Sequence, residues 1–533
     1  MKNNSKTVLF ETLRKALHMA LAANKAETTA EETIQLAEES AMTRRKFLEN
    51  TGKTALITSL IGLNTEGVFG RSFSLKKPPR IVIVGAGIAG LNALHVLKKA
   101  GLDATIYESS GRIGGRIFTV KNVMGEGTWT EFGGEFIDTN HSDMWELAKE
   151  FKLELIDYAQ TSESKLTKEA FFFNGEHRSL KDVIEGFRHF ANKIKADADR
   201  LPDEMSTAGY KIKNAYIKKL DRMSLSQYLE KIGAQGWIKT FIEVAYESEY
   251  GLSPQVQSAI NLPILISTNT EGGTLELFGE SDERYKIRGG NQSVPNALAE
   301  KYTNHIELNR SLEAISRNKS DEYELTFSGL SAPIKADFVV MTVPFSRLKN
   351  VDIRLKMPQL KWDSINTMGF GSNAKLMLGM KKHYWREQGY QGLCYSDIGI
   401  PNGWDNAQLQ TNDNEAAGLS ILFGGASGIN VGKGSPESQK DIYLPKWNRI
   451  FKGANEHFNG KVARMHWPTY PHALGSYICY RTGQYTSIAG AEAMPVGNLF
   501  FAGEHCGGDF SGYMNGAAKS GREAAEAVLL KLK

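Results

Sequence analysis

The sequence predicts a mixed α/β protein in which one domain is built from discontinuous segments and a second domain, with a mixed sheet and helices, is inserted between them. Apolar runs typical of buried strands lie far apart in the chain, at residues 80–84, 337–344 and 499–503. The first run leads into a glycine-rich turn and a helical pattern, the opening of a βαβ unit. Residues 180–265 have mostly helical periodicity instead. Strands of one sheet therefore bracket a helix-rich insertion.

Length and composition are those of a globular protein with two domains. The chain has 533 residues, of which 41% are hydrophobic and 23% are charged. Its 64 basic and 60 acidic side chains give a net charge of +4. This balance of charges is too even to suggest nucleic acid as a partner. Cys394, Cys479 and Cys506 are too few for a disulfide framework, and no spacing typical of a metal site occurs.

Residues 1–75 are interpreted as a leader. The sequence TRRKFL at residues 43–48 precedes an apolar run at residues 55–63. That run is much shorter than the ~20 residues of a membrane span, and it suits the core of a signal peptide. The pattern resembles the twin-arginine signal, an address for folded cargo, and predicts a periplasmic or secreted protein. A basic surface turn before a buried helix is the alternative.

The part of the leader before the arginines has a helical pattern of its own. Leucine recurs every four residues at positions 9, 13, 17 and 21, which places these side chains on one helical face. A second helix is expected near Thr29, with Thr29 and Glu32 as a capping box. The two helices are either marginal helices of a leader or a docking element that contacts a membrane surface or a partner.

Strands and helices alternate after the leader. A linker at residues 76–79 leads into the strand at 80–84, a helix over 88–99 and a strand at 105–108. Gly101 ends the helix.

Further elements follow along the chain. Residues 144–151 are predicted to be helical, and residues 171–175 resemble a strand that enters a turn. Short strands return between residues 305 and 343, and a long helix is expected over residues 512–530.

A GxGxxG turn at Gly85, Gly87 and Gly90 lies between the first strand and the first helix. In such a turn the first glycine permits the tight bend, the second lets the backbone approach a pyrophosphate, and the third lets the helix pack on the strand. The helix N-terminus then presents unpaired N–H groups to the phosphates. Glu108 ends the next strand, where it can accept hydrogen bonds from a ribose hydroxyl. The sequence thus predicts a Rossmann-like dinucleotide site, for a nicotinamide or a flavin.

The segment GRIGGR at residues 111–116 decides between these cofactors. Arg112 and Arg116 bracket Gly114 and Gly115 just after the ribose-binding glutamate. The segment resembles the GRxGGR signature of the flavin-containing amine oxidase superfamily, which includes monoamine oxidases and L-amino-acid oxidases. In that family the signature wraps the FAD pyrophosphate, so the resemblance implies FAD as the cofactor.

Other segments extend the resemblance over residues 80–528. Gly133 and Gly134 lie in EFGG, which resembles an acidic-x-Gly-Gly step near the flavin. Residues 288–292 and 336–344 resemble the central FAD segments of the family.

The C-terminal segments FAGE and SGYMNGA resemble the last signature of the family. By this resemblance Gly503, Glu504, Tyr513 and Met514 belong to the cofactor site. Glu504 would contact the ribityl chain, and the start of the last helix would face the carbonyl edge of the flavin. The resemblance implies an FAD-binding domain from residues 78–160, 281–345 and 471–533, and a substrate-binding domain from residues 161–280 and 346–470.

Three side chains carry the chemistry by resemblance. Lys375 matches the family lysine that holds a water near the reactive nitrogen of the flavin, and a cation there would stabilise negative charge. Tyr477 and Tyr513 match two aromatic residues that face each other across the amine in monoamine oxidases, where their rings would guide the amine. The alternatives are a solvent lysine beside a strand and two ordinary core tyrosines.

The chain departs from the covalent members of the family at Ser476. Those members have a cysteine before the first of the two aromatic residues, so Ser476 predicts non-covalent FAD. Cys479 is expected to be a core residue. His466, His472 and His505 lie near the motifs, but we predict no catalytic histidine because hydride removal from a neutral amine needs no general base.

The resemblance implies oxidative deamination of a primary or secondary amine or an L-amino acid. Hydride would pass to the flavin, the imine would hydrolyse to an aldehyde or keto acid plus ammonia, and oxygen would reoxidise the flavin and give hydrogen peroxide. An L-amino acid needs an arginine for its carboxylate. Arg288 and Arg481 are candidates, but the segment after Gly134 has no arginine, which favours amines.

Several alternatives stay open. The GRxGGR signature also occurs in FAD-dependent desaturases and porphyrinogen-type oxidases. The chain could instead be a periplasmic FAD-binding partner protein without turnover, docking through its leader. A quinone or a cytochrome could replace oxygen as the acceptor, and a homodimer is compatible with the sequence.

Overall fold

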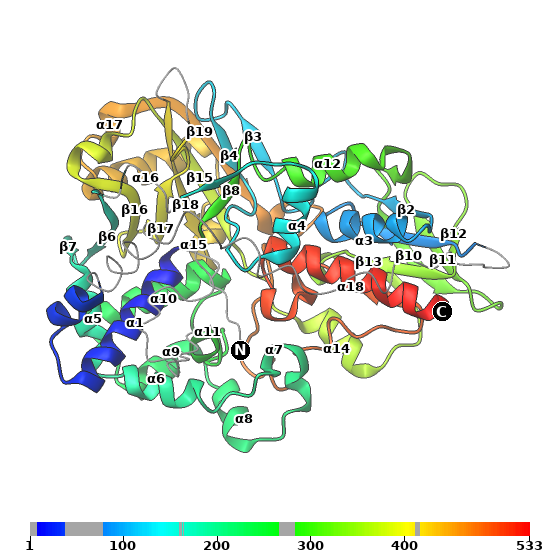
Figure 1. Cartoon of the computed structure of the whole chain (residues 1–533), viewed down its shortest axis with the longest axis horizontal. Helices are drawn as coiled ribbons and strands as arrows, with labels where there is room; N and C mark the ends of the chain where they lie inside the picture. The colour runs from blue at the N-terminus through cyan, green and yellow to red at the C-terminus, as the bar shows by residue number, and fades with distance from the viewer. Residues whose placement is uncertain (1–7, 38–77, 159–162, 164, 266–282, 411–415) are drawn as a thin grey trace, which may run out of the picture.

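The computed structural model describes residues 8–37, 78–158, 163, 165–265, 283–410 and 416–533 (Figure 1). The TRRKFL segment and the apolar run after it lie outside the described residues, so export stays a prediction. Among the helices of the described ranges, none is long and apolar enough to cross a membrane.

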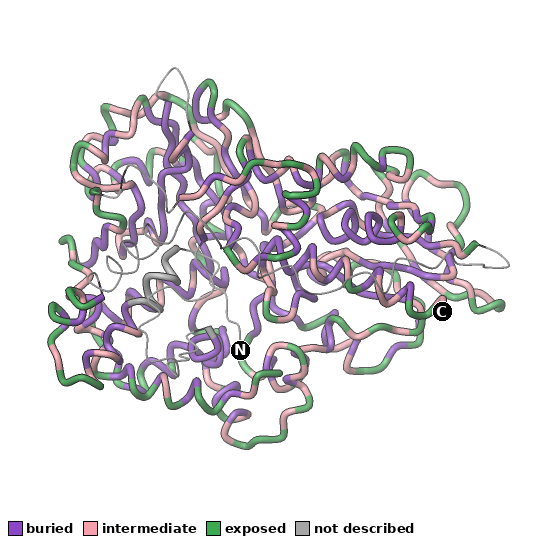
Figure 2. Tube along the Cα trace, viewed as in Figure 1, coloured by how far each residue is buried: buried purple, intermediate pink, exposed green. Residues whose placement is uncertain are grey.

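A parallel sheet of five strands forms the core of the domain that is predicted to bind FAD. Its central strand β1 (Ile81–Val84) pairs with β13 (Phe338–Met341) on one side and with β2 (Ala104–Tyr107) on the other. The edge strands are β20 (Leu499–Phe501) and β9 (Ile306–Glu307). Every residue of β1 and β13 is buried, as expected for parallel strands covered on both faces. The prediction of a sheet assembled from distant segments is confirmed. Figure 2 shows the buried residues in purple in the interior of the molecule.

Two helices far apart in the sequence pack together on this sheet. α3 (Ile88–Lys99) follows β1, and α18 (Met514–Leu532) follows β20, near the C-terminus (Figure 1). Gly521 permits their close contact, because a Cβ there would lie 2.1 Å from the carbonyl oxygen of Ala89. Since β1 and β20 are in one parallel sheet, both helices begin at its carboxyl edge.

A smaller sheet of four strands extends the FAD-binding domain. It contains β10 (Leu312–Arg317), β11 (Tyr323–Phe327), β12 (Ile334–Ala336) and β14 (Asp352–Arg354). β14 pairs with β10, so this part of the domain continues past residue 345, where we had placed its end. β14 has only three residues, two of which are charged, so the sequence shows no strand pattern there.

A sheet of seven strands forms the core of the domain that is predicted to bind the substrate. In spatial order it contains β19 (Phe458–His466), β15 (Ala374–Met380), β18 (Ala417–Phe423), β17 (Asn402–Asp405), β16 (Tyr390–Ser396), β6 (Thr167–Phe173) and β7 (Glu176–Arg178). Its helical layer, predicted over residues 180–265, contains α5 (Leu180–Arg188), α6 (Ala191–Ala198), α7 (Met205–Ala208), α8 (Ala215–Asp221), α9 (Leu225–Ile232), α10 (Gly236–Tyr250) and α11 (Asn261–Leu265).

The remaining elements connect or cover the sheets. The helices are α4 (Ser142–Glu150), α12 (Ser293–Lys301), α13 (Phe345–Leu348), α14 (Gln359–Thr367), α15 (Gly425–Asn430), α16 (Pro436–Ile450) and α17 (Ala454–His457). The strands are β3 (Thr119–Lys121) paired with β4 (Trp129–Glu131), and β5 (Leu155–Asp157) paired with β8 (Tyr285–Ile287).

The helices expected in the leader are folded onto the substrate-binding domain. α1 (Val8–Ala26) packs against α5 and α10 and buries Leu17 completely (Figure 1). Asn24 Nδ2 donates to the carbonyl oxygen of Arg188 at 2.9 Å. A second helix begins at residue 30, and the capping box is confirmed because the Thr29 N–H donates to Glu32 Oε2 at 2.9 Å and the Glu32 N–H donates to Thr29 Oγ1 at 3.2 Å.

Candidate active site

A cavity extends from the carboxyl edge of the five-stranded sheet to the seven-stranded sheet. The predicted cofactor and catalytic residues in its wall are Gly85, Gly87, Glu108, Arg112, Gly114, Gly115, Arg116, Gly133, Gly134, Lys375, Tyr477, Gly503, Glu504, Tyr513 and Met514. Gly90 is not in the wall, which agrees with its expected role between helix and strand. The structure thus gathers motifs from both ends and the middle of the chain.

The glycine turn leaves open space in front of Gly87. Gly85 has φ +106°, and a Cβ there would lie 2.5 Å from Thr342 Oγ1. A Cβ at Gly90 would lie 2.0 Å from the carbonyl oxygen of Gly85. At Gly87, in contrast, the nearest atom to a Cβ would be Gly115 Cα at 4.0 Å. The first and third glycines therefore serve the turn and the packing, whereas the second keeps the cavity free for a ligand.

Two helix N-termini without side-chain caps meet this cavity. α3 begins after Gly87, α18 begins after Tyr513, and neither has an acidic residue in its first turn. Unpaired N–H groups and the positive end of the helix dipole favour negative charge. The open space at Gly87 and the two N-termini fit FAD: the N-terminus of α3 would hold its pyrophosphate, and that of α18 would face its flavin.

Glu108, which follows β2, holds the glycine-rich turn that follows β1. Its Oε2 accepts from the Ala86 N–H at 2.7 Å, and its Oε1 accepts from the N–H and the hydroxyl of Ser110, each at 2.8 Å. Ser109 Oγ donates to Oε1 as well, at 3.2 Å, whereas Oε2 accepts from the Ala86 N–H alone among the described groups, so Oε2 can also accept from a ribose hydroxyl.

The two arginines of GRIGGR act differently. Arg112 donates to the carbonyl oxygens of Gly115 and Ile117 and to Tyr470 Oη, so it holds its own turn in shape. The guanidinium also lies 4.3 Å from the ring centroid of Phe118.

Arg116 joins the GRIGGR turn to the C-terminal motifs. Its Nη1 donates to the carbonyl oxygen of Ser476 and to Glu504 Oε1, each at 2.6 Å. Glu504 Oε2 accepts from the Ile478 N–H at 3.3 Å. One ion pair therefore fixes three segments around the cofactor site.

Lys375 places a buried positive charge in the cavity wall. It is the second residue of β15, and its Nζ donates to the carbonyl oxygens of Glu131 at 3.0 Å and Gly133 at 2.9 Å and to Glu135 Oε2 at 2.7 Å. All three N–H groups have protein acceptors, so a water that binds Lys375 must compete with one of them.

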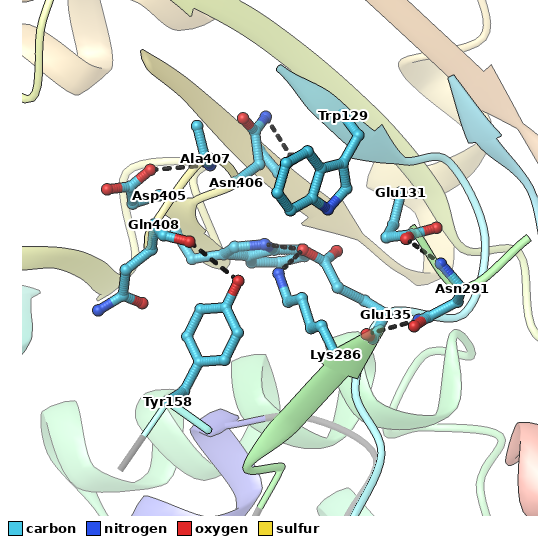
Figure 3. A network of polar contacts seen from close by, with 12 residues as sticks. Trp129, Glu131, Glu135, Tyr158, Lys286, Asn291, Asp405, Asn406, Ala407 and Gln408 are labelled. Atoms are coloured by element: carbon cyan, nitrogen blue, oxygen red, sulfur yellow. Dashed lines mark hydrogen bonds and ion pairs between the residues drawn. The ribbon is translucent and has the colours of Figure 1, made fainter. Parts of the chain in front are cut away.

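Glu135, Lys286 and Trp404 form a network with Lys375 that sequence reasoning missed. Figure 3 shows the side chains of Glu135 and Lys286 pointing toward each other. Glu135 Oε1 accepts from Lys286 Nζ at 2.6 Å and from Trp404 Nε1 at 2.8 Å. Burial alone would raise the pKa of the Glu135 carboxyl, but the two lysines lower it to about 2. The position of Glu135 directly after Gly134 is a signal that could have indicated it. Trp404 lies in β17, which carries no motif.

Tyr477 and Tyr513 both lie in the wall of this cavity. Burial raises the pKa of Tyr477 well above its ordinary value, so its hydroxyl is neutral, and Oη donates to the carbonyl oxygen of Ser248 at 3.4 Å. The ring of His141 stands edge-on to Tyr513 with centroids 5.0 Å apart. Burial lowers the pKa of His141 to about 3, so this ring is neutral too. Phe136 and Trp404 complete a largely apolar wall.

The arginine candidates for a carboxylate lie outside the cavity wall. Arg288 is exposed and pairs with Glu154 at 2.7 Å, and Arg481 is exposed as well. Of the described arginines that do line the cavity, Arg310 and Arg347 belong to the nucleotide end. The others are Arg112 and Arg116, whose donors serve the motifs.

The three predicted non-catalytic histidines have separate surroundings. His472 lines the cavity near the nucleotide end, with Nδ1 2.9 Å from Ser109 Oγ. His466 Nε2 lies 3.0 Å from the carbonyl oxygen of Gly428, and His505 is buried with its ring 4.5 Å from that of Phe345.

We expect FAD to be bound without a covalent bond. Ser476 Oγ donates to Asn373 Oδ1 at 2.6 Å, and none of the three described cysteines lies in the cavity wall. Cys479 is buried in the core, as expected. Acid precipitation of the FAD-loaded protein should therefore release the flavin into the supernatant. Flavin that stays with the precipitated chain would contradict this expectation.

Comparisons with known proteins identify the family of the chain. The model of the family described as flavin containing amine oxidoreductase matches residues 88–529. The chain is 23% identical to the flavin-containing amine oxidase of Danio rerio over 462 residues, which cover 84% of this chain and 85% of the relative. It is 23% identical to the L-amino-acid oxidase of Pseudechis australis over 517 residues, which cover 91% and 93%.

Solved structures share the fold. Cyclohexylamine oxidase from Brevibacterium oxydans IH-35A superposes with a TM-score of 0.73 at 20% identity, over 86% of this chain and all 100% of the other. Putrescine oxidase bound to putrescine gives 0.72 at 18% identity, over 85% and 99%. The fold is that of these oxidases, and the family match covers most of the chain. The chain belongs to the flavin-containing amine oxidoreductase family and is an FAD-dependent amine oxidoreductase.

Proposed function

We propose that the protein oxidises a primary or secondary amine and passes the electrons to oxygen. The observation that carries the proposal is the convergence of Lys375, Tyr477 and Tyr513 on the cavity that holds the dinucleotide motifs. FAD, when bound, supplies the acceptor for hydride from the carbon beside nitrogen. The products would be an imine, which hydrolyses to an aldehyde plus ammonia or a smaller amine, and hydrogen peroxide.

The chain positions the substrate and supplies electrostatics. The rings of Tyr477, Tyr513 and Phe136 exclude water and can orient an amine. The Lys375 ammonium, fixed by three acceptors, provides positive charge beside the reacting atoms without reorganisation.

The wall favours an amine over an amino acid. A carboxylate is best held by a bidentate arginine, and the described arginines of the wall serve the nucleotide end or the motifs. Asp138 and Glu283 line the cavity, and carboxylates there would repel the carboxylate of an amino acid. L-Amino acids, which would give a keto acid, remain the second class of substrate because relatives of both kinds exist.

Oxygen consumption with a panel of amines and L-amino acids tests the proposal. We expect turnover with at least one amine, equimolar peroxide, and slower turnover with amino acids. Protein stripped of FAD is the control. A porphyrinogen-type oxidase or desaturase would leave every nitrogen substrate unchanged, and a partner protein without turnover would consume no oxygen. Reduction of a quinone or cytochrome without oxygen uptake would contradict only the choice of acceptor.

A further inference from the structure

Lys375, Glu135 and Lys286 form a buried cluster of two ammonium groups and one carboxylate. They come from three places in the chain: β15, the loop after β4, and β8. The Glu135 carboxylate lies between the lysines, 2.7 Å from Lys375 Nζ and 2.6 Å from Lys286 Nζ. The exposed fractions of the three side chains are 7% for Lys375, 6% for Glu135 and 2% for Lys286. Buried charges of this kind are tolerated only when they are paired.

We propose that Glu135 is a positioning residue of the reaction: its carboxylate pairs with Lys375 and directs the ammonium at the flavin site. The proposal rests on the proposed function, because it assigns Glu135 a task in that same site. Both Glu135 oxygens accept from protein donors, which are Lys286, Lys375 and Trp404, so we assign Glu135 a role through Lys375 and not a contact with the substrate.

Glu135 is the carboxylate that pairs with both lysines in the described structure. Glu131 and Tyr158 interact electrostatically with the cluster, and Asp405 interacts with Tyr158. Asp138 and Glu283 line the same cavity, and Arg464 lies on β19, which pairs with β15. Burial raises the pKa of Glu131 to about 7, and its carboxyl accepts from the Asn291 N–H at 2.8 Å and from Thr119 Oγ1 at 2.8 Å (Figure 3). Asp405 is already paired with His383 at 2.7 Å.

The remaining groups are occupied or neutral. Burial raises the pKa of Tyr158 to about 12, and its Oη donates to the carbonyl oxygen of Gln408 at 2.9 Å (Figure 3). Arg464 donates to the carbonyl oxygen of Val431 at 2.9 Å. Glu135 is therefore the carboxylate that balances the two lysines.

Glu135 also links the Lys375 ammonium to the aromatic wall of the cavity. It accepts from Trp404 Nε1 at 2.8 Å, and the Trp404 ring centroid lies 5.3 Å from Lys375 Nζ. Both Trp404 and Lys375 line the cavity. A change at Glu135 therefore affects the ammonium and the aromatic wall together.

Removal of the carboxylate should make the site sensitive to pH. Without Glu135 two buried ammonium groups face each other at close range, and one of them loses its proton more easily. In the wild type Glu135 is ionised at every pH of an enzyme assay, because its pKa is lowered to about 2. In Glu135→Gln the positive charge should persist at low pH and disappear as the pH rises.

The experiment compares FAD-loaded Glu135→Gln with Glu492→Gln. Both replace a buried glutamate by its amide, but the Glu492 side chain accepts from Tyr480 Oη at 2.9 Å, pairs with neither Lys375 nor Lys286 and does not line the cavity. We expect kcat of Glu135→Gln to fall by about tenfold per pH unit above its new midpoint, with little change in KM. Glu492→Gln should keep the wild-type pH profile.

A second readout needs no substrate. The midpoint potential of bound FAD, measured by dye-linked reduction at several pH values, should become more negative in Glu135→Gln at high pH than in the wild type. If no amine is oxidised but the potential shifts as expected, the proposed function fails and the role of Glu135 stands. If amines are oxidised but the pH profile and potential of Glu135→Gln equal those of the wild type, the role of Glu135 is overturned.

The double variant Glu135→Gln/Lys286→Met covers the case in which Glu135→Gln does not fold. It keeps the net charge of the cluster, so it should fold and bind FAD. Its pH profile should return toward that of the wild type, while kcat stays about tenfold lower because Lys375 lacks its anchor. A wild-type kcat in this double variant would also overturn the proposal.

Discussion

Replacement of Lys375 by methionine is expected to lower the rate of amine oxidation by about 10²–10³-fold while FAD stays bound. The ammonium is held by three acceptors in the cavity wall, so it acts on charge that develops at the flavin site without first having to move. Methionine has a similar length and no charge. Glu135 keeps Lys286 as its partner, so the substitution does not leave a buried carboxylate alone.

The matched control is Lys381→Met. Lys381 lies just after β15, is exposed, and donates to the carbonyl oxygen of Glu456 at 3.0 Å. Stopped-flow measurement of flavin reduction separates the chemical step from reaction with oxygen. Wild-type rates in Lys375→Met with full FAD content would show that Lys375 does not contribute to catalysis.

Alanine at Gly87 and alanine at Gly90 are expected to have different effects. A Cβ at Gly90 would overlap the carbonyl oxygen of Gly85 at 2.0 Å, so α3 must move away from β1. Overpacking of this kind costs about 1–3 kcal/mol or more, so Gly90→Ala should lower both stability and FAD content. A Cβ at Gly87 has no protein atom closer than 4.0 Å and points into the space expected for the pyrophosphate. Gly87→Ala should therefore leave the apoprotein stable and weaken FAD binding by about 10–100-fold.

Each glycine variant is the control for the other. The melting temperature of the apoprotein should fall only for Gly90→Ala, and titration with FAD should show the loss of affinity for Gly87→Ala. Equal FAD affinity of Gly87→Ala and the wild type would place the pyrophosphate elsewhere.

The local elements could be predicted because the sequence signals are short-range. The helix expected over residues 88–99 is α3 (Ile88–Lys99), and the strand expected at residues 80–84 contains β1 (Ile81–Val84). The glycines of the turn and the apolar run before them fix this unit locally. The family resemblance supplied Lys375, Tyr477 and Tyr513, and the structure places all three in one cavity wall.

The network behind Lys375 could not be predicted in this way. Lys286 is in β8 and Trp404 is in β17, and their meeting with Glu135 depends on how the two domains pack. A buried lysine and a surface lysine look alike in a sequence. The same limit holds for α1, whose leucine pattern predicted a helix but could not show that α5 and α10 would cover it.

Anaerobic mixing of the FAD-loaded protein with amines tests the central claim most directly. It measures reduction of the flavin by the amine, which does not depend on whether oxygen, a quinone or a cytochrome later reoxidises the flavin. We predict that the flavin absorbance near 450 nm bleaches with at least one primary or secondary amine, at a rate that depends on amine concentration, and recovers when oxygen is admitted. Flavin that stays oxidised with every amine and amino acid tested would contradict the account.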